Sequence, residues 1–105
     1  MRYLLIILML FPALVLADDL VYRLTIRDHR FEPTELRVPA GKKIKLIVEN
    51  QDATAEEFES HELNREKVIP AKSTATVFIG PLTPGRYPFI GDFHSDTAKG
   101  VLNAE

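Results

Sequence analysis

Two short segments of the chain carry most of the side chains that could bind a metal ion. The first, residues 56–62, holds four glutamates and one histidine, His61. The second, residues 92–96, places aspartate, histidine and aspartate two positions apart. Carboxylates combined with imidazole suit iron, manganese, zinc or copper(II) better than copper(I), which prefers sulfur. The two segments therefore predict a site for a hard or borderline metal ion.

The spacing within each segment indicates which side chains could act together. Residues two positions apart in an extended strand point to the same face of the sheet. Glu57, Glu59 and His61 are therefore expected to project together. In the second segment, Asp92, His94 and Asp96 are expected to do the same if the backbone is extended there.

The sequence alone leaves open which carboxylates bind. If Phe58 points into the core, Glu56 shares its side of the strand and could join the second segment. Glu57 and Glu59 would then form a separate site on the opposite face. A bulge after Asn50 would change the phase of the strand and reconcile the two arrangements. A solvated loop that binds no ion is the other interpretation of this charged run. The predicted ligands are Glu57, Glu59, Asp92 and His94, with Glu56 and His61 as a second tier.

The length and the first residues indicate one small exported domain. Residues 1–17 have a positive start at Arg2, an apolar run and small residues ending at Ala17, which is the pattern of a secretory signal peptide. We expect cleavage after Ala17, which leaves residues 18–105 as a single domain; a retained anchor is the alternative. The 13 lysines and arginines are balanced by 15 aspartates and glutamates, so the sequence lacks the excess of positive charge that binds nucleic acid.

The sequence contains no cysteine. This excludes thiolate metal ligands, thiolate nucleophiles and disulfides. An exported domain of this size must then be stabilised by core packing, alone or together with a bound metal ion. The chain also lacks a nucleophile-elbow or catalytic-triad pattern, so we do not expect a hydrolase.

Short runs of alternating apolar and polar residues, separated by Gly and Pro turns, predict an all-β fold. The expected strands cover residues 21–27, 35–38, 42–50, 73–79, 86–90 and 101–104. Six to eight strands at near-regular spacing favour an antiparallel Greek-key β-sandwich. Residues 51–71 are expected to be irregular, with at most one helical turn at 64–67, and His29 is interpreted as a turn residue.

The run from Tyr87 to His94 resembles the tyrosine-x-phenylalanine-x-cysteine-x-x-histidine sequence that leads into the last copper loop of cupredoxins. The match places Gly91 at the cysteine and His94 at the histidine, with Ala98 near the usual methionine. Upstream, Glu56 falls at the position of the first copper histidine. The resemblance covers residues 18–105 and implies a cupredoxin β-sandwich. A blue-copper centre needs a cysteine thiolate and two histidines, so no ordinary electron carrier is implied.

Within the cupredoxins, the chain is similar to periplasmic proteins of bacterial ferrous-iron uptake, including the amino-terminal domain of the Efe-type iron-uptake lipoprotein. The resemblance rests on residues 57–60, 65–67, 92–94 and 97–100. It implies a periplasmic protein that binds iron, copper or both, and it favours Glu57 and Glu59 as ligands. It also implies an accessory role in iron(II) oxidation or transfer, with a membrane iron permease and other periplasmic iron-uptake components as partners.

Two other functions fit the same residues. A periplasmic copper-binding protein or chaperone would hold copper(II) through His94 and His61. A metal-free interaction module would use the surface of a degenerate cupredoxin sandwich. If one chain supplies too few ligands, a homodimer that shares the site is expected.

Overall fold

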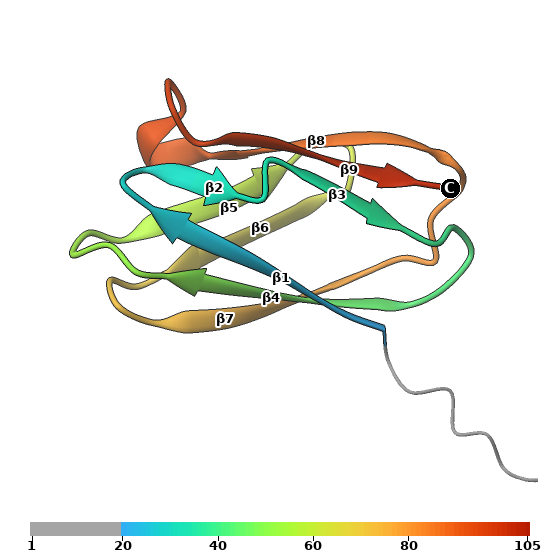
Figure 1. Cartoon of the computed structure of the whole chain (residues 1–105), viewed down its shortest axis with the longest axis horizontal. Coiled ribbons are helices and arrows are strands. Elements are labelled where there is room, and N and C mark those ends of the chain that lie inside the picture. The colour runs from blue at the N-terminus through green and yellow to red at the C-terminus, as the bar shows by residue number, and fades with distance from the viewer. Residues whose placement is uncertain (1–19) are drawn as a thin grey trace, which may run out of the picture.

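The computed structural model describes residues 20–105, so the predicted signal peptide lies outside the described residues. These residues form two β-sheets that pack face to face (Figure 1). The strands are β1 (Leu20–Arg27), β2 (Arg30–Glu32), β3 (Glu35–Val38), β4 (Ile44–Asn50), β5 (Glu56–Ser60), β6 (Arg65–Ile69), β7 (Thr74–Ile79), β8 (Gly85–Gly91) and β9 (Lys99–Ala104). A single 3-10 turn, η1 (Asp92–His94), is the one helical element of this part of the chain.

The first sheet has the strand order β2-β1-β4-β7 and the second has the order β3-β9-β8-β5-β6. The predicted all-β sandwich is confirmed. The sheets are mixed, however, because β1 runs parallel to β4 and β3 runs parallel to β9. Every other strand pair is antiparallel, as the sequence suggested. Residues 20–105 contain no helix long and apolar enough to cross a membrane.

The prediction that residues 51–71 are irregular is wrong for about half of that stretch, because two strands lie within it. β5 and β6 form an antiparallel hairpin, and Arg65 begins β6 instead of lying in a helical turn. The inward side of β5 consists of Glu56, Phe58 and Ser60, all of which are buried. Two of these three inward side chains are polar, so the apolar and polar alternation that marks a strand is hidden in the sequence.

A cluster of phenylalanines forms the centre of the core between the sheets. Phe31, Phe58 and Phe89 are almost wholly buried. The ring centroid of Phe31 lies 6.3 Å from that of Phe58 and 4.9 Å from that of Phe89, and both pairs meet edge to face. Because Phe58 points into this cluster, its neighbours Glu57 and Glu59 must point to the outer face of the second sheet.

Candidate metal centre

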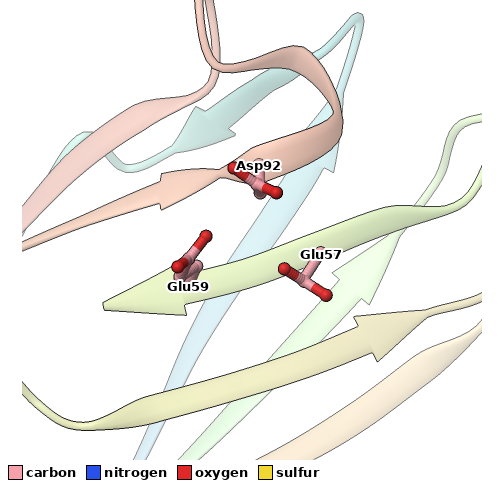
Figure 2. Close-up of side chains that lie close together, drawn as sticks. All are labelled: Glu57, Glu59 and Asp92. Atoms are coloured by element: carbon pink, nitrogen blue, oxygen red, sulfur yellow. The ribbon is translucent and has the colours of Figure 1, made fainter. Parts of the chain in front are cut away.

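Three carboxylates meet on the outer face of the second sheet. Glu57 and Glu59 rise from β5, and Asp92 is the first residue of η1 (Figure 2). One oxygen from each of the three side chains lies within 4.8 Å of the others. Glu57 and Glu59 are partly buried, whereas Asp92 is exposed. This is the one group of three or more potential metal ligands that residues 20–105 bring together.

Strand pairing explains why Asp92 reaches this group. β5 lies beside β8, with Phe58 opposite Gly91 and Glu59 opposite Ile90. β8 ends at Gly91, and η1 turns the chain so that Asp92 comes to lie over β5. The predicted common projection of Asp92, His94 and Asp96 is wrong, because residues 92–94 form a 3-10 turn, in which side chains do not alternate as in a strand.

The negative charges of the cluster alter its protonation. Partial desolvation, followed by repulsion from Glu66 and Asp92, raises the pKa of Glu57 above its usual value. Partial desolvation, followed by repulsion from Asp92 and Glu66, likewise raises the pKa of Glu59. Both shifts mean that the ionised carboxylates repel one another, and a bound cation would relieve this repulsion.

Glu66 is a fourth carboxylate at this face that the sequence does not single out. It lies on β6 directly opposite Glu59 in the strand register. Only the pairing of β5 with β6 brings it close, and no local spacing in the sequence encodes that pairing. Its contribution is electrostatic, because it adds negative potential beside Glu57 and Glu59.

The raised pKa of Glu59 predicts a specific pH dependence. The Glu59 carboxyl binds its proton more tightly in the folded state than in the unfolded chain. The free energy of unfolding therefore falls as the pH rises through the folded-state pKa of Glu59. We expect Glu59→Gln to raise the melting temperature of the ion-free protein at about pH 7, and the gain to shrink towards about pH 4. Thermal unfolding with a chelator present measures this, and an equal gain at both pH values would contradict it.

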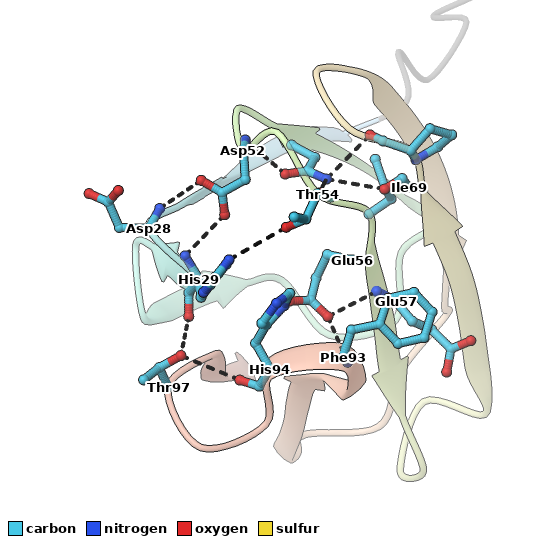
Figure 3. A network of polar contacts seen from close by, with 12 residues as sticks. Asp28, His29, Asp52, Thr54, Glu56, Glu57, Ile69, Phe93, His94 and Thr97 are labelled. Atoms are coloured by element: carbon cyan, nitrogen blue, oxygen red, sulfur yellow. Dashed lines mark hydrogen bonds and ion pairs between the residues drawn. The ribbon is translucent and has the colours of Figure 1, made fainter.

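Glu56 forms a separate, buried network at the loop end of the sandwich (Figure 3). Its side chain is 1% exposed. Glu56 Oε1 accepts hydrogen bonds from the backbone N–H groups of Glu57 at 3.0 Å and Phe93 at 2.8 Å. Glu56 Oε2 lies 2.6 Å from Nδ1 of His94. His94 therefore pairs with Glu56 and does not join the carboxylate cluster.

His29 is a turn residue, as predicted, but it also belongs to this network. Asp28 and His29 connect β1 to β2 in a two-residue turn in which both residues have positive φ. Asp52 accepts hydrogen bonds from both of their backbone N–H groups. The His29 ring stacks on that of His94, with centroids 3.6 Å apart and planes 9° from parallel.

The residues at this end do not fit a blue-copper centre. A Cβ on Gly91 would lie 2.6 Å from Glu56 Cδ and 2.7 Å from Ala98 Cβ. The Glu56 carboxylate thus fills the space beside Gly91, the position that resembles the cupredoxin cysteine. Direct contact between Glu56 and His94 leaves no space for an ion between them, and thiolate is absent from the sequence.

The second-tier candidate His61 stands apart from both groups. β5 ends at Ser60, and His61 is an exposed residue of the turn that leads to β6. Asp96 is also exposed, in the loop between η1 and β9. Of the six predicted ligands, the structure therefore brings Glu57, Glu59 and Asp92 together and pairs Glu56 with His94 elsewhere.

Comparison with known proteins identifies the same architecture. A family model described as the cupredoxin-like domain matches residues 1–104. Auracyanin A, a "blue" copper protein of Chloroflexus aurantiacus, superposes with a TM-score of 0.72 over 83% of this chain and 99% of its own, at 16% identity. The metal-binding domain of the Cu(I)-exporting P-type ATPase CopA of Streptococcus pneumoniae D39, solved with Cu(I), gives a TM-score of 0.68 over 81% of this chain and 84% of its own, at 15% identity. At these identities the likeness concerns the fold alone.

A protein of Rickettsia prowazekii (strain Madrid E) is more similar in sequence. Uncharacterized protein RP394 is 48% identical over 80 residues, which is 76% of this chain. The match spans 64% of the length of that relative, so the relative contains additional sequence.

Proposed function

Because the chain belongs to the cupredoxin-like domain family, we propose that it is a periplasmic metal-binding protein that assists ferrous-iron uptake. The observation that carries the proposal is the meeting of Glu57, Glu59 and Asp92 within 4.8 Å. In this proposal iron is the cargo of the protein and not a resident cofactor.

The chemistry of the ligands supports iron as the cargo. Carboxylate oxygens are hard ligands and prefer iron(III) to iron(II), so they favour the oxidised ion. The raised pKa values of Glu57 and Glu59 reflect repulsion that a cation would relieve. In the proposed role the chain holds the ion, and an external acceptor takes the electron that iron(II) gives up on oxidation.

The position of the cluster supports transfer to a partner. Three side chains offer one ligand atom each, which leaves other coordination positions for water or for groups of a second protein. The exposed Asp92 keeps the ion accessible from outside. We propose a membrane iron permease as the recipient, with other periplasmic iron-uptake components or a second copy of this chain able to complete the coordination.

Metal titration of residues 18–105 tests the proposal. We expect one iron(II) ion to bind under anaerobic conditions, and its affinity to fall as the pH is lowered, because protons compete with the ion for Glu57 and Glu59. Calorimetry at about pH 7 and at about pH 5 measures the change in affinity. An equal affinity at both pH values, or no binding of iron at all, would contradict the proposed site.

Copper binding is the second candidate, and the His29–His94 pair favours it. One of the two stacked imidazoles belongs to His94, which resembles a copper histidine of cupredoxins, and the two structural neighbours described above are copper proteins. Growth of a deletion strain separates the two candidates. Under iron limitation the deletion strain should grow more slowly than the wild type if the protein serves iron uptake. Under copper excess it should grow more slowly than the wild type if the protein handles copper.

A further inference from the structure

The buried carboxylate of Glu56 contacts both elements that carry the proposed ligands, although it lies outside the cluster. We propose that Glu56 is a positioning residue that holds η1 against β5, so that Asp92 reaches Glu57 and Glu59. The inference rests on the proposed function, because the positioned group is the proposed iron site.

The hydrogen bonds of Glu56 connect the two elements directly (Figure 3). Oε1 accepts from the backbone N–H of Glu57, which is itself a proposed ligand on β5. The same oxygen accepts from the N–H of Phe93, the residue that follows Asp92 in η1. Oε2 contacts His94, the last residue of η1. One side chain therefore fixes the backbone on both sides of the proposed ion position.

The η1 turn has few other attachments to β5. None of its residues is buried, and its amino-terminal end has no side-chain cap. Phe93, at its centre, is 50% exposed, so core packing does not hold the turn in place. On the far side of the loop, Thr97 Oγ1 donates a hydrogen bond to the backbone oxygen of His29, at 2.6 Å, which ties the loop to the β1–β2 turn. Asp92 follows Gly91, which pairs with Phe58 of β5, and beyond that pair Glu56 fixes the course of the turn through Phe93 and His94.

A carboxylate buried in this way is stable because its donors replace the lost water. Glu56 receives two backbone N–H groups and one imidazole nitrogen. A shorter side chain at position 56 would leave the Phe93 N–H and Nδ1 of His94 without a hydrogen-bond partner. These groups would then turn towards water, and η1 would move with them.

The length and the charge of residue 56 can be separated by two variants. Glu56→Gln keeps the reach and an amide oxygen that accepts both backbone N–H groups, but it removes the charge. Glu56→Asp keeps the charge but withdraws the carboxylate by one methylene. Ser60→Ala is the matched control, because Ser60 is an equally buried polar side chain on the inward face of β5, where it bonds to Pro88 and Leu63 rather than to η1.

Terbium(III), a luminescent hard cation, is the probe for the proposed site. We expect Glu56→Asp to lower its affinity by about 10–100-fold, as loss of a residue that orients metal ligands does. Glu56→Gln should stay within about threefold of the wild type, because the neutral amide retains the hydrogen bonds that fix the backbone. The luminescence lifetime should shorten in Glu56→Asp, since water replaces Asp92 around the ion. Ser60→Ala should change neither quantity.

Other outcomes would overturn the positioning role. An equal loss of terbium(III) affinity in Glu56→Gln and Glu56→Asp would show that the charge of residue 56 is needed. An unchanged affinity in Glu56→Asp would show that the length of the side chain is not needed. A loss in Ser60→Ala as large as that in Glu56→Asp would show a general effect of burial. If Glu56→Asp does not fold, Gly91→Ala combined with Ala98→Gly tests the same point. The Cβ at position 91 then meets the Glu56 carboxyl, while the second change removes its contact with Ala98 Cβ.

Amide hydrogen exchange separates this inference from the proposed function. If the wild type binds neither iron(II) nor terbium(III), the proposed function fails. The positioning role is then decided by the Phe93 amide, which should exchange faster in Glu56→Asp than in the wild type or Ser60→Ala. An unchanged Phe93 exchange rate would overturn the positioning role even if the wild type binds iron.

Discussion

Replacing both Glu57 and Glu59 by glutamine is expected to abolish tight iron binding, with a loss of affinity of at least about 100-fold, since even residues that only orient ligands cost 10–100-fold. The two side chains supply two of the three ligand atoms that the structure brings together. Glutamine keeps the size of each side chain and removes its charge, so the strand should be preserved. Isothermal titration with iron(II) under anaerobic conditions measures the loss.

The ion-free form of this double variant should be more stable than the wild type near neutral pH. Burial and mutual repulsion raise the pKa of both carboxyls in the folded state, so neutralising them removes a destabilising interaction. The matched control combines Glu49→Gln with Asp96→Asn, which removes the same charge from exposed positions outside the cluster. If the control loses iron binding to the same extent, net charge and not the cluster attracts the ion.

Replacing Phe58 by alanine is expected to lower the free energy of unfolding by about 3–5 kcal/mol, as truncation of a large buried aromatic does. Phe58 is wholly buried and lies against both Phe31 and Phe89. Because small domains are stable by only about 5–15 kcal/mol, this variant should be close to unfolding at physiological temperature. Urea unfolding followed by circular dichroism measures the change.

Phe78→Ala provides the comparison for Phe58. Phe78 lies on β7 and is 62% exposed, so its truncation should change stability by no more than about 0.5 kcal/mol. Phe58 also separates Glu57 from Glu59 along β5, so loosening its packing should weaken iron binding even where the variant remains folded. A Phe58→Ala variant as stable as Phe78→Ala would mean that the three-phenylalanine cluster does not stabilise the sandwich.

Much of the fold could be predicted from alternation in single strands. Tyr22, Leu24 and Ile26 on β1 point inward as the period of two requires, and Ile44, Leu46 and Val48 on β4 are buried likewise. The parallel pairing of β1 with β4 could not be predicted, because a strand pattern records which side is buried and not which neighbour it meets. The β5–β6 hairpin could not be predicted because Glu56 and Ser60 are polar although they point inward. Polar residues at these positions make the segment look like a loop in the sequence.

The candidate site was predictable to the same extent. The spacing of Glu57 and Glu59 predicts a shared face, and strand β5 confirms it. Asp92 joins them through the pairing of β5 with β8 and the turn of η1, neither of which a local pattern encodes. The inward position expected for Glu56 if Phe58 faces the core is also observed. The stacking of His29 on His94 joins residues 65 positions apart, so only the fold could reveal it.

Gly91 and Glu56 lie so close together that the residue at one position limits which residue the other position can hold. They compete for one volume, so a side chain at position 91 would displace the Glu56 carboxylate from its present position. A single change of Gly91 to cysteine would meet the Glu56 carboxylate before it could serve a metal. A single shortening of Glu56 would leave the N–H groups of Glu57 and Phe93 unsatisfied. Each single step is expected to lower stability, so passage between this sandwich and a thiolate copper protein is favoured when both positions change together.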